Sequence, residues 1–582
     1  MIDNAMDSKQ PKYKWEQIEP KKRKEAELLV AAFNIPLWIA HLLTQRNVCS
    51  ELQVRQFFSP SSLEVHDPFL MSDMEKAVQQ LLYTISQGHK IMVYGDYDVD
   101  GTTAVSMMSD FLDEVPADHI TYIPDRFQEG YGVSMLGIET AINENCKLII
   151  TLDCGIRALK PIAKAKENGI KVIVCDHHEP GHELPPAFAI LNPKKENCNY
   201  PFKELSGAGV GFKLIQAFSQ EQGLDWDDIA HHLDLLALSI AADMVSIQGE
   251  NRFLASQGLK ILNSNHRRTG LDLLLTKAKR NEIQLTISDL VFALAPRINA
   301  AGRLGSASDA ILVLKNSGAL KTKQKTVVKI EKLNGQRKLL DQRTKEEALE
   351  QIKLSNNHQL THCTVVNGPW HKGVVGIVAS RLIENFYRPT VVLAEQDELL
   401  TGSVRSIEGI DVHLALKHCA PLLKKFGGHQ MAAGLLLEKT QLNAFRKSFN
   451  EAILLQKKEH LLPTLKVHAK VELDEWSDKI FKIIERMEPF GPGNPRPLFM
   501  AENVMLESAP QFMGQEKKHV RLKLRQNEKS SMNFNAVFFN ASPVCDELKE
   551  RSRIDLVYVM ERNNWKGQST VQIRIKDLAL SQ

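Results

Sequence analysis

The stretch IMVYGDYDVDGTTA, residues 91 to 104, begins as an apolar β run and ends in a Gly-Thr-Thr turn into a helical pattern. Three aspartates, Asp96, Asp98 and Asp100, stand at alternate positions after the apolar run. Alternate side chains of a β-strand point to the same face, so the three carboxylates are expected to lie together. Crowded carboxylates raise each other's pKa, and burying them uncompensated is costly. A divalent cation would compensate them, and we prefer this interpretation to a solvated acidic turn.

The bulk composition excludes several classes of protein. The 582 residues suggest three or four domains, and the 43% hydrophobic and 25% charged content is typical of a soluble globular protein. There is no apolar run long enough for a membrane helix, and the polar, acidic N-terminus does not resemble a signal peptide. Eight cysteines without a C-x-x-C pair indicate a reducing, cytoplasmic environment. The net charge of +3 neither requires nor excludes nucleic acid.

Strand and helix patterns alternate between residues 71 and 265. Apolar runs recur at residues 91–94, 119–123, 148–152 and 172–175, with helical patterns between some of them. Such runs predict a parallel sheet that is covered on both faces. Ligands bind at the carboxyl ends of the strands in sheets of this kind. Further acidic or histidine residues are therefore expected just after these strands.

Two more of the predicted strands end in this way. Asp153-Cys154-Gly155 follows the run at 148–152, and Asp176-His177-His178 follows the run at 172–175. A single aspartate at such a position often only caps a helix. Three acidic strand ends at one sheet edge are harder to explain by capping. Asp243, which ends a helical run at 235–242, remains open between a ligand and a partnered helix-end acid.

The residue types indicate which metal would bind. Aspartate and histidine without cysteine suit Mg²⁺ or Mn²⁺ better than structural zinc. More than four carboxylates with an imidazole suggest two ions, which together would generate hydroxide and stabilise an in-line displacement at phosphorus.

The motifs GDYDVDG (95–101), DCG (153–155) and DHH (176–178) resemble those of the DHH phosphoesterase superfamily. Within it, the segments 296–305, 370–381 and 427–434 are similar to the RecJ family of single-stranded-DNA-specific exonucleases. The resemblance covers roughly residues 40 to 580. It implies an α/β fold with a parallel-sheet DHH domain, a second α/β DHH-associated domain joined to it by a long helix, and a C-terminal OB-fold β barrel.

The resemblance also implies a two-ion Mn²⁺ or Mg²⁺ site. Asp98 would bind the first ion and Asp100 the second, Asp153 would bridge them, and His177 and Asp243 would complete the second site. His178 would act on the scissile phosphate or the attacking water, and Asp176 would orient His177. Many superfamily members carry a histidine four residues before the aspartate that corresponds to Asp98. Tyr94 stands there in this chain, so Asp96 would substitute as the ligand.

Further residues are expected to bind the nucleic acid. Arg126 follows a predicted strand end, where the alternative is a plain surface loop, and the resemblance makes Arg303 a DNA contact. Two Gly/Ser loops, at 402–406 and 427–429, could cradle phosphate. The resemblance assigns Ser403 and Arg405 to the 5′-terminal phosphate, and His429 to a position facing the metals across a cleft.

We expect five parts in the chain. These are an N-terminal helical segment (1–70), the catalytic domain (71–265), a helical connector with a long linking helix (266–355), the DHH-associated domain (356–458) and the OB-fold (459–582). A coiled coil is the alternative for the long helix. The OB-fold carries a basic cluster at 517–525, whose alternative is a solubilising edge strand. Phe534, Phe538 and Trp565 are either base-stacking or core residues.

The resemblance implies a metal-dependent 5′→3′ exonuclease that degrades single-stranded DNA to mononucleotides in DNA repair and recombination. We expect a cytoplasmic monomer with no membrane contact, and a single-strand-binding protein and a helicase as partners. One alternative is a phosphodiesterase for short oligonucleotides or cyclic dinucleotides. The others are an inactive relative, which would require lost ligands, and a nucleic-acid-binding scaffold, which would tolerate Asp153→Ala.

Overall fold

The computed structural model describes residues 11–60, 65–281, 283–354, 362–456, 462–514, 516–565 and 568–581, without the side chains of 564–568. The chain forms two compact units. One comprises residues 62–461, and the other joins residues 1–61 to residues 462–582. Among the described residues, none of the helices has the length and hydropathy of a membrane span.

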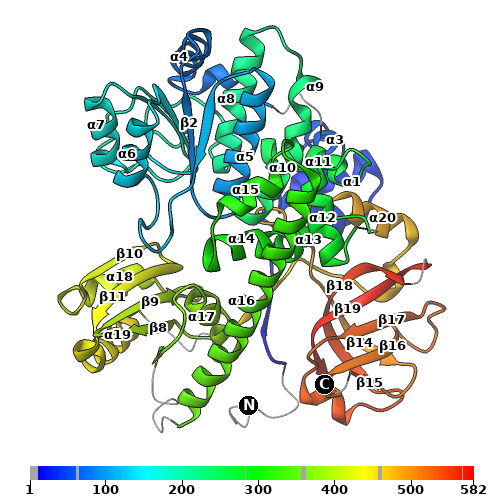
Figure 1. Ribbon diagram of the computed structural model, residues 1–582. Helices are drawn as coiled ribbons and strands as arrows, with labels where there is room; N and C mark the ends of the chain where they lie inside the picture. The colour runs from blue at the N-terminus through cyan, green and yellow to red at the C-terminus, as the bar shows by residue number, and fades with distance from the viewer. Residues whose placement is uncertain are drawn as a thin grey trace. The chain divides into compact units, whose positions relative to one another are not determined.

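A five-stranded parallel sheet forms the centre of the first α/β domain of the first unit (Figure 1). Its order is β3-β2-β4-β5-β6, and every neighbouring pair is parallel. The sequence predicted four of these strands and missed β6, which is only three residues long. The strands are β2 (Ile91–Gly95), β3 (His119–Tyr122), β4 (Leu148–Leu152), β5 (Lys171–Cys175) and β6 (Ala189–Leu191).

Helices cover both faces of this sheet, as the apolar strands predicted. Ile91 and Val93 of β2 pack into the core under α4 (Met74–Ser86), α5 (Val99–Glu114) and α8 (Gly207–Glu221). Met92 and Tyr94 of the same strand pack on the opposite face, under α6 (Met135–Asn143) and α7 (Leu159–Glu167). The carboxyl ends of the strands stay free of these layers, and the aspartates lie there.

A helical region follows the sheet and ends in one long helix. Its helices are α9 (Trp226–Ile229), α10 (Leu233–Ala242), α11 (Gly249–Leu262), α12 (Thr269–Ala278), α13 (Ile287–Asp289), η4 (Leu290–Leu294), α14 (Ala295–Leu304), α15 (Ser308–Leu314) and α16 (Leu320–Leu354). Val327 and Ile330 of α16 belong to the core of the sheet domain, whereas Ala348 and Ile352 belong to a core of the next domain. The helix therefore bridges two domains, as predicted, and is not a coiled coil.

The second domain of this unit is also α/β. Its sheet has the order β10-β11-β9-β8-β7, in which only the β7–β8 pair is parallel. Its elements are β7 (Thr364–Gly368), α17 (Val375–Phe386), β8 (Thr390–Gln396), β9 (Leu399–Arg405), α18 (Val412–His418), β10 (Lys425–Gly428), β11 (Ala432–Glu438) and α19 (Leu442–Gln456). The prediction of loops at 402–406 and 427–429 was wrong for most of these residues. Ser403 and Arg405 lie on β9, and Gly427 and Gly428 lie on β10, because neighbouring strands hydrogen-bond the backbone there.

The other unit contains a seven-stranded sheet of order β13-β14-β18-β19-β17-β16-β15, and β14 also pairs with β16. This extra pairing closes five of the strands into a barrel, as an OB-fold requires. The elements are β12 (Thr464–Val467), β13 (Ala469–Lys470), α20 (Asp478–Arg486), β14 (Phe499–Leu506), β15 (Gln511–Met513), β16 (His519–Arg525), β17 (Phe534–Phe538), β18 (Arg553–Trp565) and β19 (Gln568–Leu580). Phe534 and Phe538 are buried core residues, and the side chain of Trp565 lies outside the described residues.

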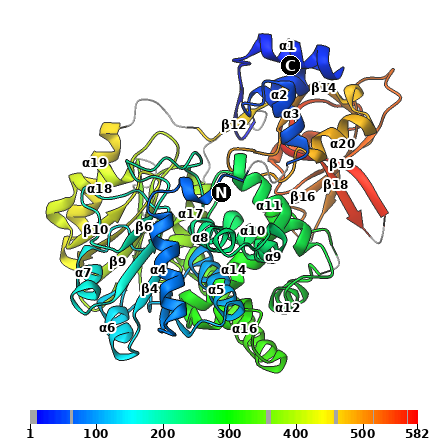
Figure 2. The ribbon, with the colours of Figure 1, turned by 90° about the horizontal axis from the view of Figure 1, so that it is seen from above.

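The N-terminal segment is not wholly helical, contrary to the prediction. Besides α1 (Arg23–Phe33), α2 (Leu37–Thr44) and α3 (Glu51–Phe58), it contains β1 (Lys14–Gln17), which pairs in parallel with β12. Figure 2 shows its helices grouped with β14 and α20. Trp38 contacts Trp476, and buried Arg46 donates to Asn494 Oδ1 at 2.6 Å. The segment therefore shares the barrel's core.

Short 3₁₀ helices complete the described structure: η2 (Pro68–Leu70), η3 (Ala230–His232), η5 (Ala420–Leu422), η6 (Lys439–Gln441), η7 (Leu473–Glu475) and η8 (Pro543–Glu547). The domain boundaries predicted at 355/356 and 458/459 lie outside the described residues.

Candidate active site

The end of β2 and the start of α5 position three carboxylates. The strand ends at Gly95 and the helix begins at Val99, so Asp96, Asp98 and Asp100 do not alternate along a strand as the sequence suggested. Asp98 is the N-cap of α5, and its Oδ1 accepts a hydrogen bond of 3.1 Å from Gly101 N. A strand-to-helix turn rather than β geometry therefore brings the three carboxylates together.

The start of α8 fixes the carboxylate of Asp100. Asp100 accepts hydrogen bonds from Gly207 N at 2.7 Å, Ala208 N at 2.9 Å and Ser239 Oγ at 2.7 Å. The free N–H groups of a helix N-terminus stabilise an anion in this position. Gly207 is required here because a Cβ on it would lie 2.4 Å from Asp153 Cβ. The Ser-Gly-Ala-Gly segment at 206–209 is a sequence signal that we did not use.

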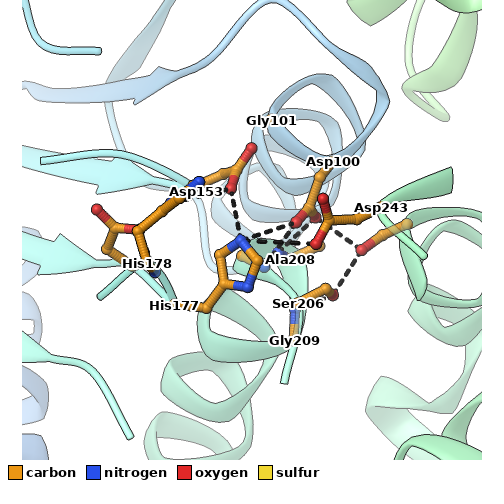
Figure 3. A network of polar contacts seen from close by, with 12 residues as sticks. Asp100, Gly101, Asp153, His177, His178, Ser206, Ala208, Gly209 and Asp243 are labelled. Atoms are coloured by element: carbon orange, nitrogen blue, oxygen red, sulfur yellow. Dashed lines mark hydrogen bonds and ion pairs between the residues drawn. The ribbon is translucent and has the colours of Figure 1, made fainter. Parts of the chain in front are cut away.

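His177 lies at the centre of the cluster (Figure 3). Its Nε2 is 3.2 Å from Asp153 Oδ1, 3.6 Å from Asp243 Oδ2 and 3.9 Å from Asp100 Oδ2. The nitrogen is buried and has no hydrogen-bond partner among the described residues. Burial lowers the pKa of His177, which favours the neutral imidazole that a metal ligand must be. Asp243, left open by the sequence, thus belongs to the cluster.

Asp153 is buried and strained. Its φ angle is +61°, which is uncommon outside glycine, and its N–H donates to Cys175 O at 2.9 Å on the neighbouring strand. Burial raises its pKa well above the usual value, and the charge of Asp100 adds to this effect. Strained residues of this kind concentrate at functional sites, and here the conformation keeps the Asp153 carboxylate among like charges.

Asp96 is the least compensated of the carboxylates. Both of its oxygens are buried and have no hydrogen-bond partner among the described residues. Burial raises its pKa well above the usual value, and the charge of Asp98 raises it further. The carboxylates of Asp96, Asp98 and Asp153 have oxygens within 4.8 Å of one another. An uncompensated group of this kind is costly in any protein that does not bind a cation there.

Tyr94 does not take part in the cluster. It is fully buried on the other face of the sheet, where it stacks on Tyr122. Its hydroxyl donates to Gly132 O at 3.0 Å and accepts from Ser134 N at 3.0 Å. Tyr94 therefore holds the segment around residue 132, and the carboxylate of Asp96 is free to serve the metal site.

His178 lies between an aspartate and a tyrosine. Its Nδ1 is 2.7 Å from Asp176 Oδ1, and its Nε2 is 2.9 Å from the Tyr131 hydroxyl. Burial alone would lower the pKa of His178, but the contact with Asp176 raises it above the usual value. The expected contact between Asp176 and His177 is not observed, because Asp176 turns to His178. The sequence analysis missed Tyr131, although it lies between Gly130 and Gly132, shortly after Arg126.

Three arginines meet beside the carboxylates. Arg126 lies over the Tyr97 ring at 4.8 Å, Arg303 Nη1 donates to Gly373 O at 3.1 Å, and Arg405 Nη1 donates to Ser403 Oγ at 2.7 Å. Burial lowers the pKa of Arg303 to about 10, and the charges of Arg126, Arg337 and Arg405 add to this effect. None of the three forms an ion pair with a carboxylate in the described part of the chain.

These arginines are the components of an anion site, because an anion would relieve their mutual repulsion. The first turn of α17 lies against Arg405 as well, since a Cβ on Gly376 would be 2.9 Å from Arg405 Nη2. Arg337 of α16, which the sequence analysis missed among many exposed charges, adds to the positive potential. Arg297 lies in the same sequence segment as Arg303 (296–305), but its side chain forms an ion pair with Glu331 at 2.8 Å. Arg297 therefore stabilises the fold and does not belong to the anion site.

One cavity of about 710 Å³ lies beside the carboxylates and His178. Its lining includes Asp98, Asp153, His178 and Asp243 of the sheet domain, together with His429 of the second α/β domain. His429 is exposed in the turn between β10 and β11. The sequence prediction that this histidine faces the carboxylates across a cleft is consistent with its place in the cavity wall.

The donor set fits divalent cations. Ligand atoms of three overlapping groups lie within 4.8 Å of one another: Asp96, Asp98 and Asp153; Asp100, His177 and Asp243; and Asp153, His177 and His178. Oxygen and imidazole donors suit Mn²⁺ or Mg²⁺. The unpartnered Asp96 oxygens and His177 Nε2 are the atoms that such ions would satisfy.

Three models of known families match separate parts of the chain. The model of the DHH family, N-terminal domain, matches residues 90–240, the DHHA1 domain model matches residues 358–454, and the RecJ OB domain model matches residues 467–577.

Curated relatives match nearly the whole length. The single-stranded-DNA-specific exonuclease RecJ of Bacillus subtilis is 36% identical over 574 residues, which cover 98% of this chain and 71% of the relative. The protein of the same name from Escherichia coli is 32% identical over 592 residues, covering 97% and 99%.

Solved structures agree with this result. The crystal structure of RecJ in complex with Mn²⁺ from Thermus thermophilus has a TM-score of 0.82 and 25% identity, and the match covers 98% of this chain and 80% of that one. A structure of exonuclease RecJ bound to manganese has a TM-score of 0.57 and 32% identity, covering 66% and 95%.

Proposed function

This chain belongs to the RecJ family of single-stranded-DNA-specific exonucleases, and we propose that it hydrolyses single-stranded DNA from the 5′ end and releases mononucleotides. The observation that carries the proposal is the buried cluster around His177, in which the carboxylates of Asp96, Asp153 and Asp243 form no ion pair with a lysine or arginine in the described part of the chain. Such a site is chemically useful only with divalent ions bound, and a phosphodiester is the substrate that such ions activate.

We assign Asp96, Asp98 and Asp153 to one ion and Asp100, His177 and Asp243 to the other, with Asp153 shared. When bound, Mn²⁺ or Mg²⁺ lowers the pKa of a water molecule and neutralises charge on the phosphate. The protein's own contribution is to fix the ligands. The start of α8 holds Asp100, and the strained backbone of Asp153 turns its carboxylate toward His177.

His178 acts on the substrate rather than on the ions. Asp176 accepts the Nδ1 proton of His178, which leaves Nε2 directed toward Tyr131 and the cavity. With its raised pKa, His178 carries a proton more readily than an ordinary histidine and can donate a hydrogen bond to a phosphate oxygen. Asp176 is thus a positioning residue for His178.

The arginine cluster supports recognition of a 5′ end. Arg126 and Arg303 hold the phosphate next to the cleaved bond, and Ser403, Arg405 and the first turn of α17 hold the terminal phosphate. His429 contacts the strand from the opposite wall of the cavity. A pocket that binds the 5′-terminal phosphate lies at a fixed distance from the carboxylates. The bond that is cleaved is therefore the one next to the terminal nucleotide, which is exonuclease action.

The barrel supports binding of the continuing strand. The outward face of β16 carries exposed Arg521 and Lys523, between buried residues. Arg521 is opposite Val537 of β17, which is opposite Arg574 of β19, so the two arginines share one row across the sheet. Phe539 is 46% exposed and contacts His519 and Arg574. Single-stranded DNA binds to surfaces where positive charges contact its phosphates and an exposed aromatic ring stacks on a base. The alternative of a solubilising edge strand is disfavoured because β16 pairs on both sides.

We propose a role in DNA repair and recombination, with a single-strand-binding protein and a helicase as partners, and a monomer in the cytoplasm. All eight cysteines are unpaired, which supports a reducing compartment. We also propose the division of the chain at 70, 265, 355 and 458. The first segment joins the barrel's core, which supports its folding together with the last domain.

A degradation assay tests the function. The full chain would be incubated with single-stranded DNA carrying a label at the 5′ or the 3′ end, and with the matching duplex, in Mn²⁺ or in EDTA. We expect early release of the 5′ label as mononucleotide, slow loss of the 3′ label, and no reaction in EDTA or with Asp153→Asn. Early release of the 3′ label would contradict the polarity, and unchanged activity in EDTA would contradict the metal dependence.

A further inference from the structure

A second cluster of metal-binding side chains lies away from the active site. It consists of Glu114, the last residue of α5, and the adjacent His231 and His232 of η3. Ligand atoms of the three residues lie within 4.8 Å of one another. None of the three lines the cavity of the active site.

His232 has an unusual environment within this cluster. Its side chain is 0% exposed, and neither ring nitrogen has a hydrogen-bond partner among the described residues. A neutral imidazole has one N–H donor and one lone pair, and leaving both unused in the interior is costly. His232 Nε2 lies 3.6 Å from Glu114 Oε2, which is too far for a hydrogen bond but directs the nitrogen toward the carboxylate.

The other two residues complete the geometry. His231 Nε2 is 2.8 Å from Glu114 Oε1, and the two imidazole rings have centroids 4.0 Å apart. Ligand atoms about 2 Å from a tetrahedral ion are roughly 3.3 Å from one another. The distances from the Glu114 oxygens, 2.8 Å to His231 Nε2 and 3.6 Å to His232 Nε2, lie on either side of this value. Glu114 and His231 are each 42% exposed at their side chains, so an ion could enter and water could complete its shell.

We propose that Glu114, His231 and His232 form a binding site for a transition-metal ion of the Zn²⁺ class. Two imidazoles and one carboxylate are a donor set that zinc takes in proteins, and they suit Zn²⁺ better than Mg²⁺.

The position of the site gives it a structural role. Helix α5 carries Asp98 and Asp100 at its start and Glu114 at its end, and α10 follows His232 and ends at Asp243. Asp100 contacts Ser239 of α10, so the two helices are packed together as an antiparallel pair. An ion bound at the Glu114 end would hold these two helices together. This end lies roughly 24 Å from the catalytic carboxylates, which is the length of α5.

Metal counting on the full chain tests the proposal. The protein would be stripped with EDTA, equilibrated with Zn²⁺, desalted and analysed for bound zinc. We expect the wild type to retain one more equivalent of Zn²⁺ per chain than His231→Asn, and the control His418→Asn, an exposed histidine at the end of α18, to match the wild type. Equal zinc content in wild type and His231→Asn would overturn the proposal. If His231→Asn fails to fold, Glu114→Gln gives the same comparison.

A spectroscopic measurement separates this ion from those in the active site. Co²⁺ would replace Zn²⁺, and the visible absorption of wild type minus His231→Asn would be recorded. The difference spectrum should show the bands of four-coordinate Co²⁺, and the same bands should persist in Asp153→Asn. Their loss in Asp153→Asn would assign the signal to the catalytic cluster and would contradict the proposal.

Discussion

The hydroxyl of Tyr131 lies 2.9 Å from His178 Nε2, and the same imidazole is held at Nδ1 by Asp176 at 2.7 Å. The histidine is thus fixed at both nitrogens, once by a buried carboxylate and once by a tyrosine that is 58% exposed. The tyrosine contact is the weaker and more accessible of the two, so a phosphate oxygen can replace it when substrate enters.

Tyr131→Phe should lower kcat by roughly fivefold, because a hydrogen bond worth about 1 kcal/mol no longer orients His178 before substrate arrives. His178→Asn, which removes the group itself, should lower kcat by about 10²–10⁴-fold. Steady-state hydrolysis of single-stranded DNA gives both values. Tyr83→Phe, at an exposed tyrosine on α4, is the matched control. Equal losses in Tyr131→Phe and His178→Asn would contradict the orienting role.

Arg405→Gln should raise the KM for 5′-phosphorylated DNA by roughly 10- to 100-fold, since a hydrogen bond to a charged group is worth about 1.5–3 kcal/mol. The KM for DNA with a 5′-hydroxyl should change little, because that substrate lacks the anion. Competition between the two substrates measures the ratio directly. A similar loss for both would show that Arg405 does not bind the terminal phosphate.

At a pH above the raised pKa of Asp96, Asp96→Asn should stabilise the metal-free protein, because the substitution removes a buried charge that has no hydrogen-bond partner in the described part of the chain. A gain of roughly 1–3 kcal/mol in unfolding free energy is expected in EDTA. The rise in Tm that Mn²⁺ produces should become smaller in the same variant. Asp227→Asn, at an exposed aspartate, should change neither quantity. A lower Tm of Asp96→Asn in EDTA would contradict the role of Asp96 as a ligand without internal compensation.

Acid should destabilise the unit that contains the barrel through His468. Burial, with a smaller contribution from Arg46, lowers the pKa of His468 to about 4 from its ordinary value of 6.5. Its Nδ1 accepts a hydrogen bond from Leu498 N at 3.1 Å, which requires the unprotonated nitrogen. Between these two pKa values His468 is protonated in the unfolded chain but not in the folded chain. The free energy of unfolding therefore falls as the pH decreases from about 6.5 to about 4.

The gap between these two pKa values corresponds to about 3 kcal/mol at the acid end of the window. His468→Gln keeps a hydrogen-bond acceptor but cannot titrate, so its Tm should fall less than that of the wild type between pH 7 and pH 4. His266→Gln, at an exposed histidine, should behave as the wild type does. Parallel Tm curves for wild type and His468→Gln would contradict this assignment.

The arginine row on the barrel should bind phosphates of the DNA backbone. Replacing both Arg521 and Arg574 by glutamine should weaken binding of single-stranded DNA and flatten the dependence of log K on log salt by about 0.7 for each phosphate that is no longer neutralised. Fluorescence anisotropy across a salt series measures the slope. A slope equal to that of the wild type would exclude this face from the DNA path.

The strand ends could be predicted from the sequence because buried parallel strands are nearly continuous apolar runs, and a ligand residue directly after such a run can lie only at the carboxyl edge of the sheet. Asp153 and His177 follow from this rule alone. Asp243 did not, because it ends a helix and nothing in the local sequence indicates which neighbour that helix end approaches.

Other features depended on tertiary contacts that the sequence pattern does not show. Ser403 and Arg405 lie in a Gly/Ser-containing segment that suggests a loop, yet pairing of β9 with β8 and β11 makes it a strand. Asp176 could orient either neighbouring histidine, and its side-chain rotamer selects His178. Phe534 and Phe538 became core residues through closure of the barrel, while Phe539, one position further, is exposed.

The central claim is that the carboxylates around His177 hold two divalent ions. Crystals of the full chain soaked in Mn²⁺ and measured at the manganese absorption edge would test it directly. The account predicts two anomalous peaks, one beside Asp96 and Asp98 and one beside His177 and Asp243, with Asp153 between them. Crystals that show no anomalous peak among these side chains at saturating Mn²⁺ would contradict it.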